Sequence, residues 1–164
     1  MLERMYQKRL KGYSGIGYKT KCADNPAESV SSIFDNTNFL DAFATDIIAA
    51  KRSAVIVSPF VSKRVVNKLI RIFEPVMDRL TIVTRPQTDY ADDSNRRRVS
   101  GCIEILESHG INVKFKSKIH QKFAVIDEKL IWYGSINFLS FGISEESVMR
   151  LESTAIAAEL LGNI

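Results

Sequence analysis

The stretch KIHQKFAVIDEKLIWYGSIN, residues 118–137, contains two short apolar runs separated by a polar turn. The runs are KFAVID and LIWYGS, and the turn lies at residues 127–129. Runs of this length, rich in β-branched and aromatic residues on both sides of a tight turn, are typical of an antiparallel β-hairpin. The hairpin decides the fold, because it departs from the pattern that precedes it.

Strands and helices alternate before the hairpin. Predicted strands are SAVIVSPF, LTIVTR and INVKFK, at residues 53–60, 80–85 and 111–116. Helices are predicted to begin near residues 35–37, 62 and 92–94, where capping side chains precede apolar residues at helical spacing. After the hairpin, SVMRLES predicts one more strand and TAIAAELLG a closing helix.

This alternation predicts an α/β domain whose sheet is largely parallel in its first half and antiparallel at the hairpin. The first 35 residues show weak periodicity and several glycines. We therefore expect an N-terminal arm or extension at residues 1–35 and a folded domain at residues 36–164.

Composition restricts the class of protein. The 164 residues are 45% hydrophobic and 26% charged, an ordinary globular balance for one domain. No apolar run approaches the roughly 20 residues of a membrane-spanning helix, and the first residues lack the apolar centre of a secretion signal. Two distant cysteines, Cys22 and Cys102, argue against a disulfide scaffold or a cysteine zinc site. We expect a soluble, cytoplasmic protein with free thiols and no membrane association.

The formal charge of +4 and the pI of about 9.1 indicate a modest preference for anionic partners. Basic residues gather in the N-terminal segment, in RRR at residues 96–98 and in KFKSK at residues 114–118. The arginine run alone is typical of a solvated face. The KFKSK cluster leads directly to His120, which makes it the better candidate for a functional role.

Polar side chains occupy the two outer ends of the hairpin. His120 and Lys122 project to one side if both lie in a strand, because side chains alternate with a period of two. Ser135 and Asn137 share a side in the same way, in the returning strand or just past its end. Pairing of the two strands brings all four together at one rim of the sheet.

Such a cluster suits a tetrahedral phosphate. A neutral imidazole is a good nucleophile, and lysine, serine and asparagine donate hydrogen bonds to phosphate oxygens. The imidazole needs a partner that sets its tautomer, and Glu145 and Glu146 are both candidates. This chemistry needs no metal or other cofactor, and no convincing metal-ligand cluster is present.

A structural interpretation competes with the catalytic one. A single histidine near a strand end is usually structural, and Gly-Ser-x-Asn is ordinary turn chemistry. His109, next to Gly110 at a predicted helix end, has no polar companions. We interpret His109 as a surface or helix-capping residue.

The joint spacing decides between them. His120-x-Lys122, four residues, Asp127, six residues, and Gly134-Ser135-x-Asn137 resemble the signature of the phospholipase D superfamily, and Glu146 follows as in that family. The wider chain, from about residue 39 to 160, resembles small bacterial phospholipase D-like nuclease domains, including those attached to DNA helicases. The resemblance implies a mixed, largely central β-sheet flanked by helices on both faces.

The resemblance also implies roles for the motif residues. His120 is the expected nucleophile, which forms a phosphohistidine intermediate. Lys122 and Asn137 are expected to hold phosphate oxygens, and Ser135 to assist them. The two carboxylates of the motif are Glu146, expected to orient the imidazole, and Asp127, expected to be mainly structural at the turn.

The family uses two such motifs, and this chain has one. The resemblance therefore implies a symmetric homodimer in which two copies of His120 share one site. One copy acts as the nucleophile, and the other acts as acid and then as base. A monomer is expected to be nearly inactive.

The leading hypothesis is a metal-independent phosphodiesterase acting on nucleic acid, with a DNA endonuclease as the main expectation. Candidate substrate-binding residues are Lys63, Arg64, Arg85, Lys116 and Lys118. One alternative is a phospholipid phosphodiesterase, although the sequence shows no amphipathic membrane-docking helix. The other is a nucleic-acid-binding or dimerisation module with a helicase-like partner or parent chain.

Overall fold

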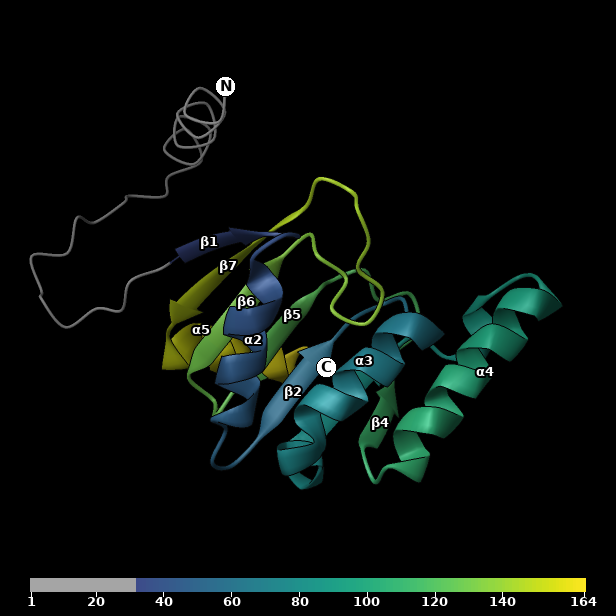
Figure 1. Cartoon of the computed structure of the whole chain (residues 1–164), viewed down its shortest axis with the longest axis horizontal. Helices are drawn as coiled ribbons and strands as arrows, with labels where there is room; N and C mark the ends of the chain where they lie inside the picture. The colour runs from purple at the N-terminus through teal and green to yellow at the C-terminus, as the bar shows by residue number, and fades with distance from the viewer. Residues whose placement is uncertain (1–31) are drawn as a thin grey trace, which may run out of the picture.

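The computed structural model describes residues 32–164, which form one seven-stranded sheet in the order β1-β7-β6-β5-β2-β3-β4 (Figure 1). The strands are β1 Ser32–Asp35, β2 Ala54–Val57, β3 Leu80–Thr84, β4 Asn112–Phe115, β5 Phe123–Ile126, β6 Leu130–Gly134 and β7 Ser147–Glu152. The α-helices are α2 Phe39–Ile48, α3 Lys63–Phe73, α4 Asp93–Ser108 and α5 Thr154–Gly162. Two 3₁₀ helices are η1 Glu74–Arg79 and η2 Gln87–Asp89.

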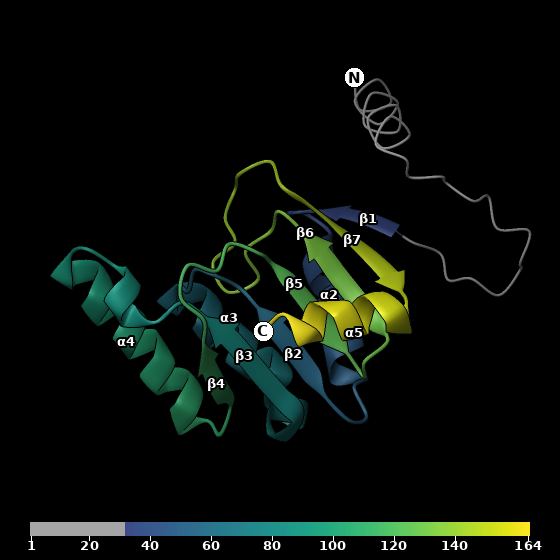
Figure 2. The ribbon, with the colours of Figure 1, turned by 180° about the vertical axis from the view of Figure 1, so that it is seen from behind.

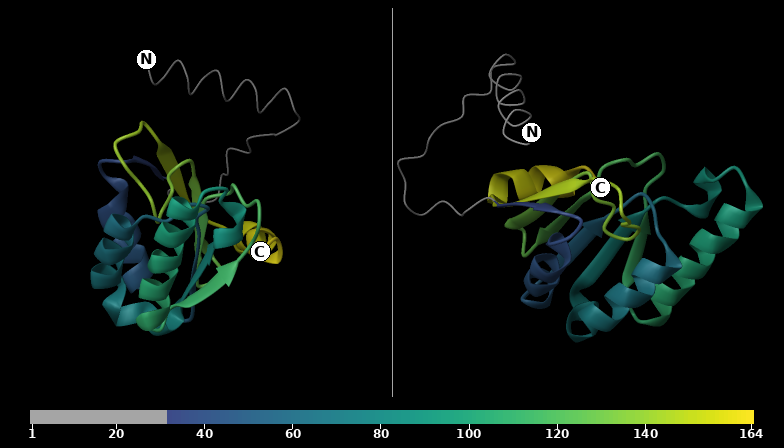
Figure 3. Two further views of the ribbon diagram at one scale, coloured as in Figure 1. Left: turned by 90° about the vertical axis from the view of Figure 1, so that its right-hand side faces the viewer. Right: turned by 45° about the horizontal axis from the view of Figure 1, so that its top comes forward.

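The sheet is mixed, and helices cover both of its faces. Strands β2, β3 and β4 run parallel, whereas β5, β6, β7 and β1 pair antiparallel. Helices α2, α3 and α4 lie on one face, and α5 lies on the other (Figures 2 and 3). The predicted fold class is confirmed, and so is the hairpin, which β5 and β6 form.

The predicted N-terminal arm overlaps the sheet at its end. Residues Ser32–Asp35 form β1 and pair with β7, at the outer edge of the sheet. The rest of the expected arm, with Cys22 and the basic residues of the N-terminal segment, lies outside the described residues. The boundary at residue 36 is thus preceded by at least one strand of the same sheet.

Local sequence accounts for the start of each long helix. Asp92 caps α4, since its carboxylate accepts a hydrogen bond from the Asn95 backbone N–H at 2.7 Å. Ser62 precedes α3 as expected, but its side chain makes no capping hydrogen bond. Gly110 follows α4 with a φ of 77°, a conformation that glycine adopts without a steric cost.

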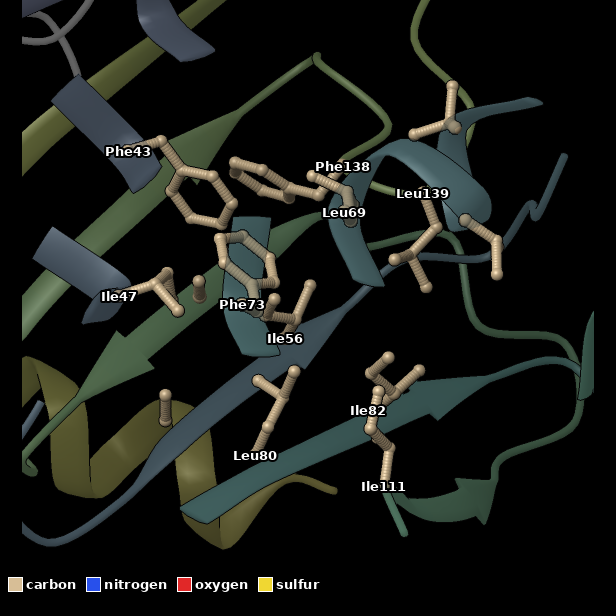
Figure 4. Packing of buried hydrophobic residues seen from close by; sticks show 14 of the residues in the cluster. Phe43, Ile47, Ile56, Leu69, Phe73, Leu80, Ile82, Ile111, Phe138 and Leu139 are labelled. Carbon is tan, nitrogen blue, oxygen red and sulfur yellow. The ribbon is translucent and has the colours of Figure 1, made fainter. Parts of the chain in front are cut away.

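Aromatic rings fill the core between the sheet and helices α2 and α3. Phe43 stacks on Phe138 with ring centroids 4.7 Å apart and meets Phe73 edge-on (Figure 4). Trp132 is fully buried against Phe43, and its indole N–H donates to the Asp46 carboxylate at 2.8 Å. The buried ring thus keeps its polar atom satisfied, which fixes the sheet against α2.

A second, smaller core lies under α5 and includes Phe123, Ile131 and Ala157. Strand β5 is buried along its whole length, because both faces of the sheet are covered there. The hairpin is therefore held rigidly, and its outer ends emerge from a packed scaffold.

Strand register places the outer ends of the hairpin beside the carboxyl ends of β2 and β3. Val57, the last residue of β2, pairs with Phe123, the first residue of β5. Phe123 in turn pairs with Tyr133, near the end of β6. We name this rim, where His120 and Ser135 lie, the upper edge of the sheet; the β5–β6 turn lies at the lower edge. Crevices outside the carboxyl ends of parallel strands are frequent ligand sites.

Candidate active site

His120 lies in the loop that leads into β5, three residues before the strand begins. The expectation that strand alternation places His120 and Lys122 on one side is wrong, because β5 starts only at Phe123. A hydrogen bond brings the two residues together instead. The Lys122 ammonium Nζ donates to the His120 carbonyl O at 2.9 Å, while the His120 side chain is exposed.

Ser135 lies just past the end of β6, directly across from the Lys122 end of β5. The Gly134 N–H donates to the Lys122 carbonyl O at 3.3 Å, which closes the pairing between the two strands. Ser135 is anchored to the start of β7, because its N–H donates to the Ser147 O at 2.8 Å and its Oγ accepts from the Ser147 N–H at 3.0 Å. The two ends of the hairpin therefore converge as predicted.

Gly134 is required by the close approach of β6 and β7. A Cβ at this position would lie 2.2 Å from the Ser147 carbonyl O, much closer than van der Waals contact allows. Only glycine fits, so the Gly-Ser pair of the motif has a steric reason next to its chemical one.

Asn137 projects a buried polar atom that has no partner among the described residues. Its Oδ1 is buried and unpaired, and so is the hydroxyl Oγ1 of Thr84 at the carboxyl end of β3. An unpaired buried polar atom costs about 1–3 kcal/mol, so such atoms are scarce and need an explanation. Both atoms belong to the upper edge, where a bound ligand or water can satisfy them.

Ser58 completes this polar layer beneath the site. It follows β2, is fully buried, and its Oγ donates to the Phe60 O at 3.2 Å and accepts from the Leu139 N–H at 3.4 Å. Sequence reasoning overlooked both Ser58 and Thr84. Their only signal was a polar residue directly after a buried strand, which ordinary strand ends also show.

The two candidate orienting carboxylates differ in exposure. Glu146 is half-buried immediately before β7, whereas Glu145 is exposed. No hydrogen bond joins Glu146 to the His120 ring within residues 32–164. Of the two, Glu146 lies nearer the Ser135–Ser147 contact, so it remains the predicted partner of the imidazole.

Asp127 lies at the lower edge, at the opposite end of the hairpin from His120. Its carboxylate accepts hydrogen bonds from the backbone N–H groups of Lys51, Arg52 and Ser53 at 2.7–3.2 Å. Burial raises the pKa of Asp127, but the three donors outweigh this effect, and the pKa lies below its ordinary value. Asp127 also adopts a left-handed φ of 51° in the turn, and its position keeps it away from the other motif side chains.

His109 is likewise remote from the upper edge. It follows the last residue of α4, and its exposed ring nitrogen Nδ1 lies 2.8 Å from the Ile105 carbonyl O. This contact satisfies one of the carbonyls at the helix end, in keeping with the capping role predicted for His109.

The basic residues named as substrate contacts divide into two groups. Lys63 and Arg64 form the first turn of α3, and both are exposed. The Arg64 guanidinium donates to the Phe141 carbonyl O at 3.0 Å, in the loop between β6 and β7. Both residues thus lie close to the loop that carries Asn137.

The second group surrounds the loop before His120. The Lys116 ammonium bonds to the Asn163 carbonyl at the end of α5, so that side chain is already engaged. Lys118 adopts a left-handed φ of 58°, and its backbone N–H donates to Asp89 Oδ2 at 2.8 Å. The same oxygen lies 3.4 Å from Arg85 Nε. Asp89 therefore ties the loop of His120 to the end of β3.

The bond from Lys118, with smaller help from Ser117 and Arg85, lowers the pKa of Asp89. Two aromatic rings flank Arg85: its guanidinium lies 5.6 Å from the Phe60 ring centroid and 5.3 Å from that of Tyr90. Sequence reasoning missed Phe60, Asp89 and Tyr90, because their partners are far apart along the chain.

Two searches bear on the class of site. Across residues 32–164, no group of three or more His, Cys, Asp or Glu side chains is placed to hold a metal ion. Over the same residues, no helix combines the length and apolar character needed to cross a membrane.

Comparison with known families identifies the fold and the chemistry class. Residues 43–163 match the family described as "Cardiolipin synthase, PLD-like domain", where PLD is phospholipase D. The chain belongs to this PLD-like family. It is accordingly a phosphodiesterase hydrolase, and the resemblance drawn from the motif is confirmed at family level. The helicase-associated subtype stays a prediction. No curated protein sequence matches the chain.

Solved structures share this fold at low sequence identity. Nuc from Salmonella typhimurium, a phospholipase D family member, aligns with a TM-score of 0.63 and 17% identity, over 82% of this chain and 90% of that one. NucT from Helicobacter pylori aligns with a TM-score of 0.59 and 18% identity, over 82% and 92%. The archaeal chromatin protein TrmBL2 has a TM-score of 0.52 and 9% identity, over 98% and 58%. At these identities the likeness establishes the fold.

Proposed function

We propose that this PLD-like chain is a metal-independent nuclease that cleaves nucleic acid, chiefly DNA, through a phosphohistidine at His120. The observation that supports the proposal most is the convergence of His120, Lys122, Ser135 and Asn137 at the upper edge, with His120 exposed and the Asn137 Oδ1 unpaired among residues 32–164. A tetrahedral phosphate diester suits this set of donors.

In the first step, an imidazole nitrogen of His120 attacks phosphorus, and the bond from phosphorus to the leaving oxygen breaks. The leaving oxygen takes a proton from His120 of a second copy of the chain, which acts as general acid. The products are an alcohol and a phosphodiester-like phosphohistidine. In the second step, that second histidine takes a proton from water, whose oxygen attacks phosphorus and releases His120.

Three side chains are proposed to stabilise the charge that develops on the phosphate. Lys122 supplies a positive charge beside His120, and Asn137 and Ser135 donate hydrogen bonds from the facing end of β6. A removed donor of this type costs typically about 10²- to 10³-fold in rate. Glu146 is proposed to accept a hydrogen bond from the imidazole and so to fix the reactive tautomer.

The homodimer is proposed because the chemistry needs two histidines, and the described residues offer only one at the upper edge. His109 is remote and lies against the Ile105 carbonyl. A two-fold axis near His120 places two copies in one site. Equilibrium sedimentation should show a dimer at concentrations where the enzyme is active, and activity per chain should fall on dilution below the dissociation constant.

The substrate class is proposed from charge. Lys63, Arg64, Lys118 and Arg85 all lie around the upper edge, and a polyanionic backbone binds such a rim through its phosphates. Contacts to phosphate carry no sequence information, so we expect little sequence preference.

The test is digestion of plasmid and oligonucleotide in excess chelator, with His120→Ala beside the natural chain. Cleavage that resists chelation and disappears in the variant supports the proposal. Salt-sensitive binding without any cleavage would instead indicate a binding or dimerisation module. Turnover of a phosphatidylcholine analogue, with none of the nucleic acid, would indicate a phospholipid phosphodiesterase.

A further inference from the structure

The outer surface of α3 carries a basic groove that the proposed reaction does not use. Arg64, Asn67, Lys68 and Arg71 line a shallow hollow together with Ile72. Residues spaced by three, four and seven lie on the same side of a helix, so these polar groups form one continuous strip. We call Arg64, Asn67, Lys68 and Arg71 the α3 basic face.

The cations of this helix have no acidic partners. Helix α3 has the sequence KRVVNKLIRIF, which contains four basic residues and no acidic one. None of these four side chains belongs to an ion pair found in residues 32–164. Like charges at spacings such as Arg64–Lys68 oppose the helix by about 0.2–0.5 kcal/mol per pair.

The first turn of α3 is also unfavourable for cations. Lys63 and Arg64 occupy the end of the helix where the macrodipole favours negative charge, and the first turn contains no acidic residue. Ser62 gives no side-chain cap. Local stability therefore does not explain the charge of α3. Departures from local preference of this kind concentrate at functional surfaces.

Helix α4 shows the contrast. It also carries three consecutive arginines, but Asp92 caps it and Asp93 lies in its first turn. Arg96 forms an ion pair with Asp93 at 3.0 Å, and Arg98 bonds to Asn95. The arginine run of α4 is thus largely compensated by its own helix, as expected of a solvated face, whereas the α3 basic face is not.

The α3 basic face begins beside the candidate active site. The Ser62 N–H donates to the Leu139 O at 2.9 Å, and Arg64 donates to the Phe141 O at 3.0 Å. Both acceptors lie in the loop that joins β6 to β7 and carries Asn137. From there α3 runs along the helical face of the sheet (Figure 1), and seven residues extend about 10 Å, the rise of about three nucleotides in a strand.

We propose that the α3 basic face binds the phosphate backbone of the substrate nucleic acid beyond the cleaved bond. This inference rests on the proposed nuclease function and adds a second contact region to it. Arg64 and Arg71 offer planar forks for phosphate oxygens, Lys68 a point charge and Asn67 a neutral donor. The face serves strands long enough to leave the upper edge, and a substrate of two or three nucleotides does not reach it.

The test measures binding in a His120→Ala background, so that cleavage does not interfere. Fluorescence anisotropy of a labelled 20-base-pair duplex, titrated over a range of salt, gives the slope of log K against log salt. Lys68→Gln with Arg71→Gln should make this slope less steep by about 1.4–1.8, which is 0.7–0.9 for each lost phosphate contact. Affinity at low salt should fall at least several-fold, while binding of a trinucleotide should lose much less.

Lys51→Gln is the matched control for Lys68→Gln. Lys51 is an exposed lysine at the lower edge, and its side chain forms no ion pair within the described part of the chain. Its loss should leave the slope unchanged, whereas Lys68→Gln alone should lower it by about 0.7–0.9. Thermal unfolding of each variant checks that the fold is kept.

The outcomes separate this inference from the nuclease proposal. Equal slopes for the double variant and its parent, in a chain that still cleaves DNA, overturn the α3 basic face alone. A lowered slope in a chain that cleaves no phosphodiester supports the face and overturns the catalytic proposal. Weakened binding to phosphatidylglycerol vesicles, with oligonucleotide binding unchanged, overturns the inference in favour of a lipid surface.

Discussion

The two ends of the β5–β6 hairpin treat their polar residues in opposite ways. At the lower edge, both carboxylate oxygens of Asp127 accept backbone hydrogen bonds, and its own carbonyl accepts from Arg52 at 2.8 Å. At the upper edge, His120 is exposed and the Asn137 Oδ1 lacks a partner among residues 32–164. One short motif thus combines a saturated end and an unsaturated end.

The difference separates stability from chemistry. A polar group whose hydrogen bonds are all used within the fold stabilises the fold, and a substrate has little left to bind. A group that is exposed or unpaired adds little to folding and stays available. We therefore expect substitutions at the upper edge to reduce activity and those at the lower edge to reduce stability.

The largest effect is expected for His120→Ala. Loss of the proposed nucleophile should lower hydrolysis of bis(p-nitrophenyl) phosphate by a factor of about 10⁴ or more. The free energy of unfolding should change by less than about 0.5 kcal/mol, because the side chain is exposed. A variant that keeps more than a tenth of the activity would remove the chemical meaning of the upper edge.

Lys122→Ala should lower the same rate by about 10²- to 10³-fold, because it removes one charged donor beside the phosphate. Lys129→Ala is the comparison from the lower end of the hairpin. Lys129 forms an exposed ion pair with Glu152 at 2.6 Å, so its loss should cost about 1 kcal/mol of stability at most. Equal rates for the two variants would contradict the division between the ends.

Asp127→Ala should lower the free energy of unfolding by about 2–3 kcal/mol, since three backbone N–H groups lose a charged acceptor. Thermal or denaturant unfolding measures this change. Below the unfolding transition, the folded variant should keep its rate within about threefold. A large loss of activity at unchanged stability would move Asp127 into the chemistry.

Gly134→Ala connects the two kinds of effect. The added methyl group would lie 2.2 Å from the Ser147 carbonyl O, so β6 and β7 must separate at a cost of about 1–3 kcal/mol. Ser135 shifts with β7, which should lower activity as well. Gly101→Ala is the matched control, because a Cβ there meets no atom within 4 Å, and it should stabilise α4 by about 0.5–1 kcal/mol.

The smallest effect is expected in the acid range. The folded pKa of Asp127 lies below its unfolded value of roughly 3.9, so the stabilising contribution is complete above that value and is lost as pH falls through the folded pKa. Asp127→Asn should remove this part of the acid sensitivity. Its unfolding free energy should fall less steeply than that of the natural chain below about pH 4, in urea titrations at several pH values.

Most of the elements and the motif residues of the site were predictable from short-range patterns. The hairpin followed from two apolar runs and a polar turn, and α4 from the capping side chain of Asp92. The convergence of Lys122 and Ser135 followed from strand pairing alone. The loop before β5 was not predictable, because its shape depends on Asp89, 29 residues from Lys118.

The sequence by itself determined the period of each strand and helix, the steric need for Gly134 and the spacing of the motif, since these depend on neighbours a few residues away or on one strand pairing. Only the tertiary structure decided that Ser58, Thr84 and Asn137 form one buried polar layer, and that α3 presents uncompensated cations beside it. Such arrangements arise from packing of segments far apart in the chain, which local preferences do not encode.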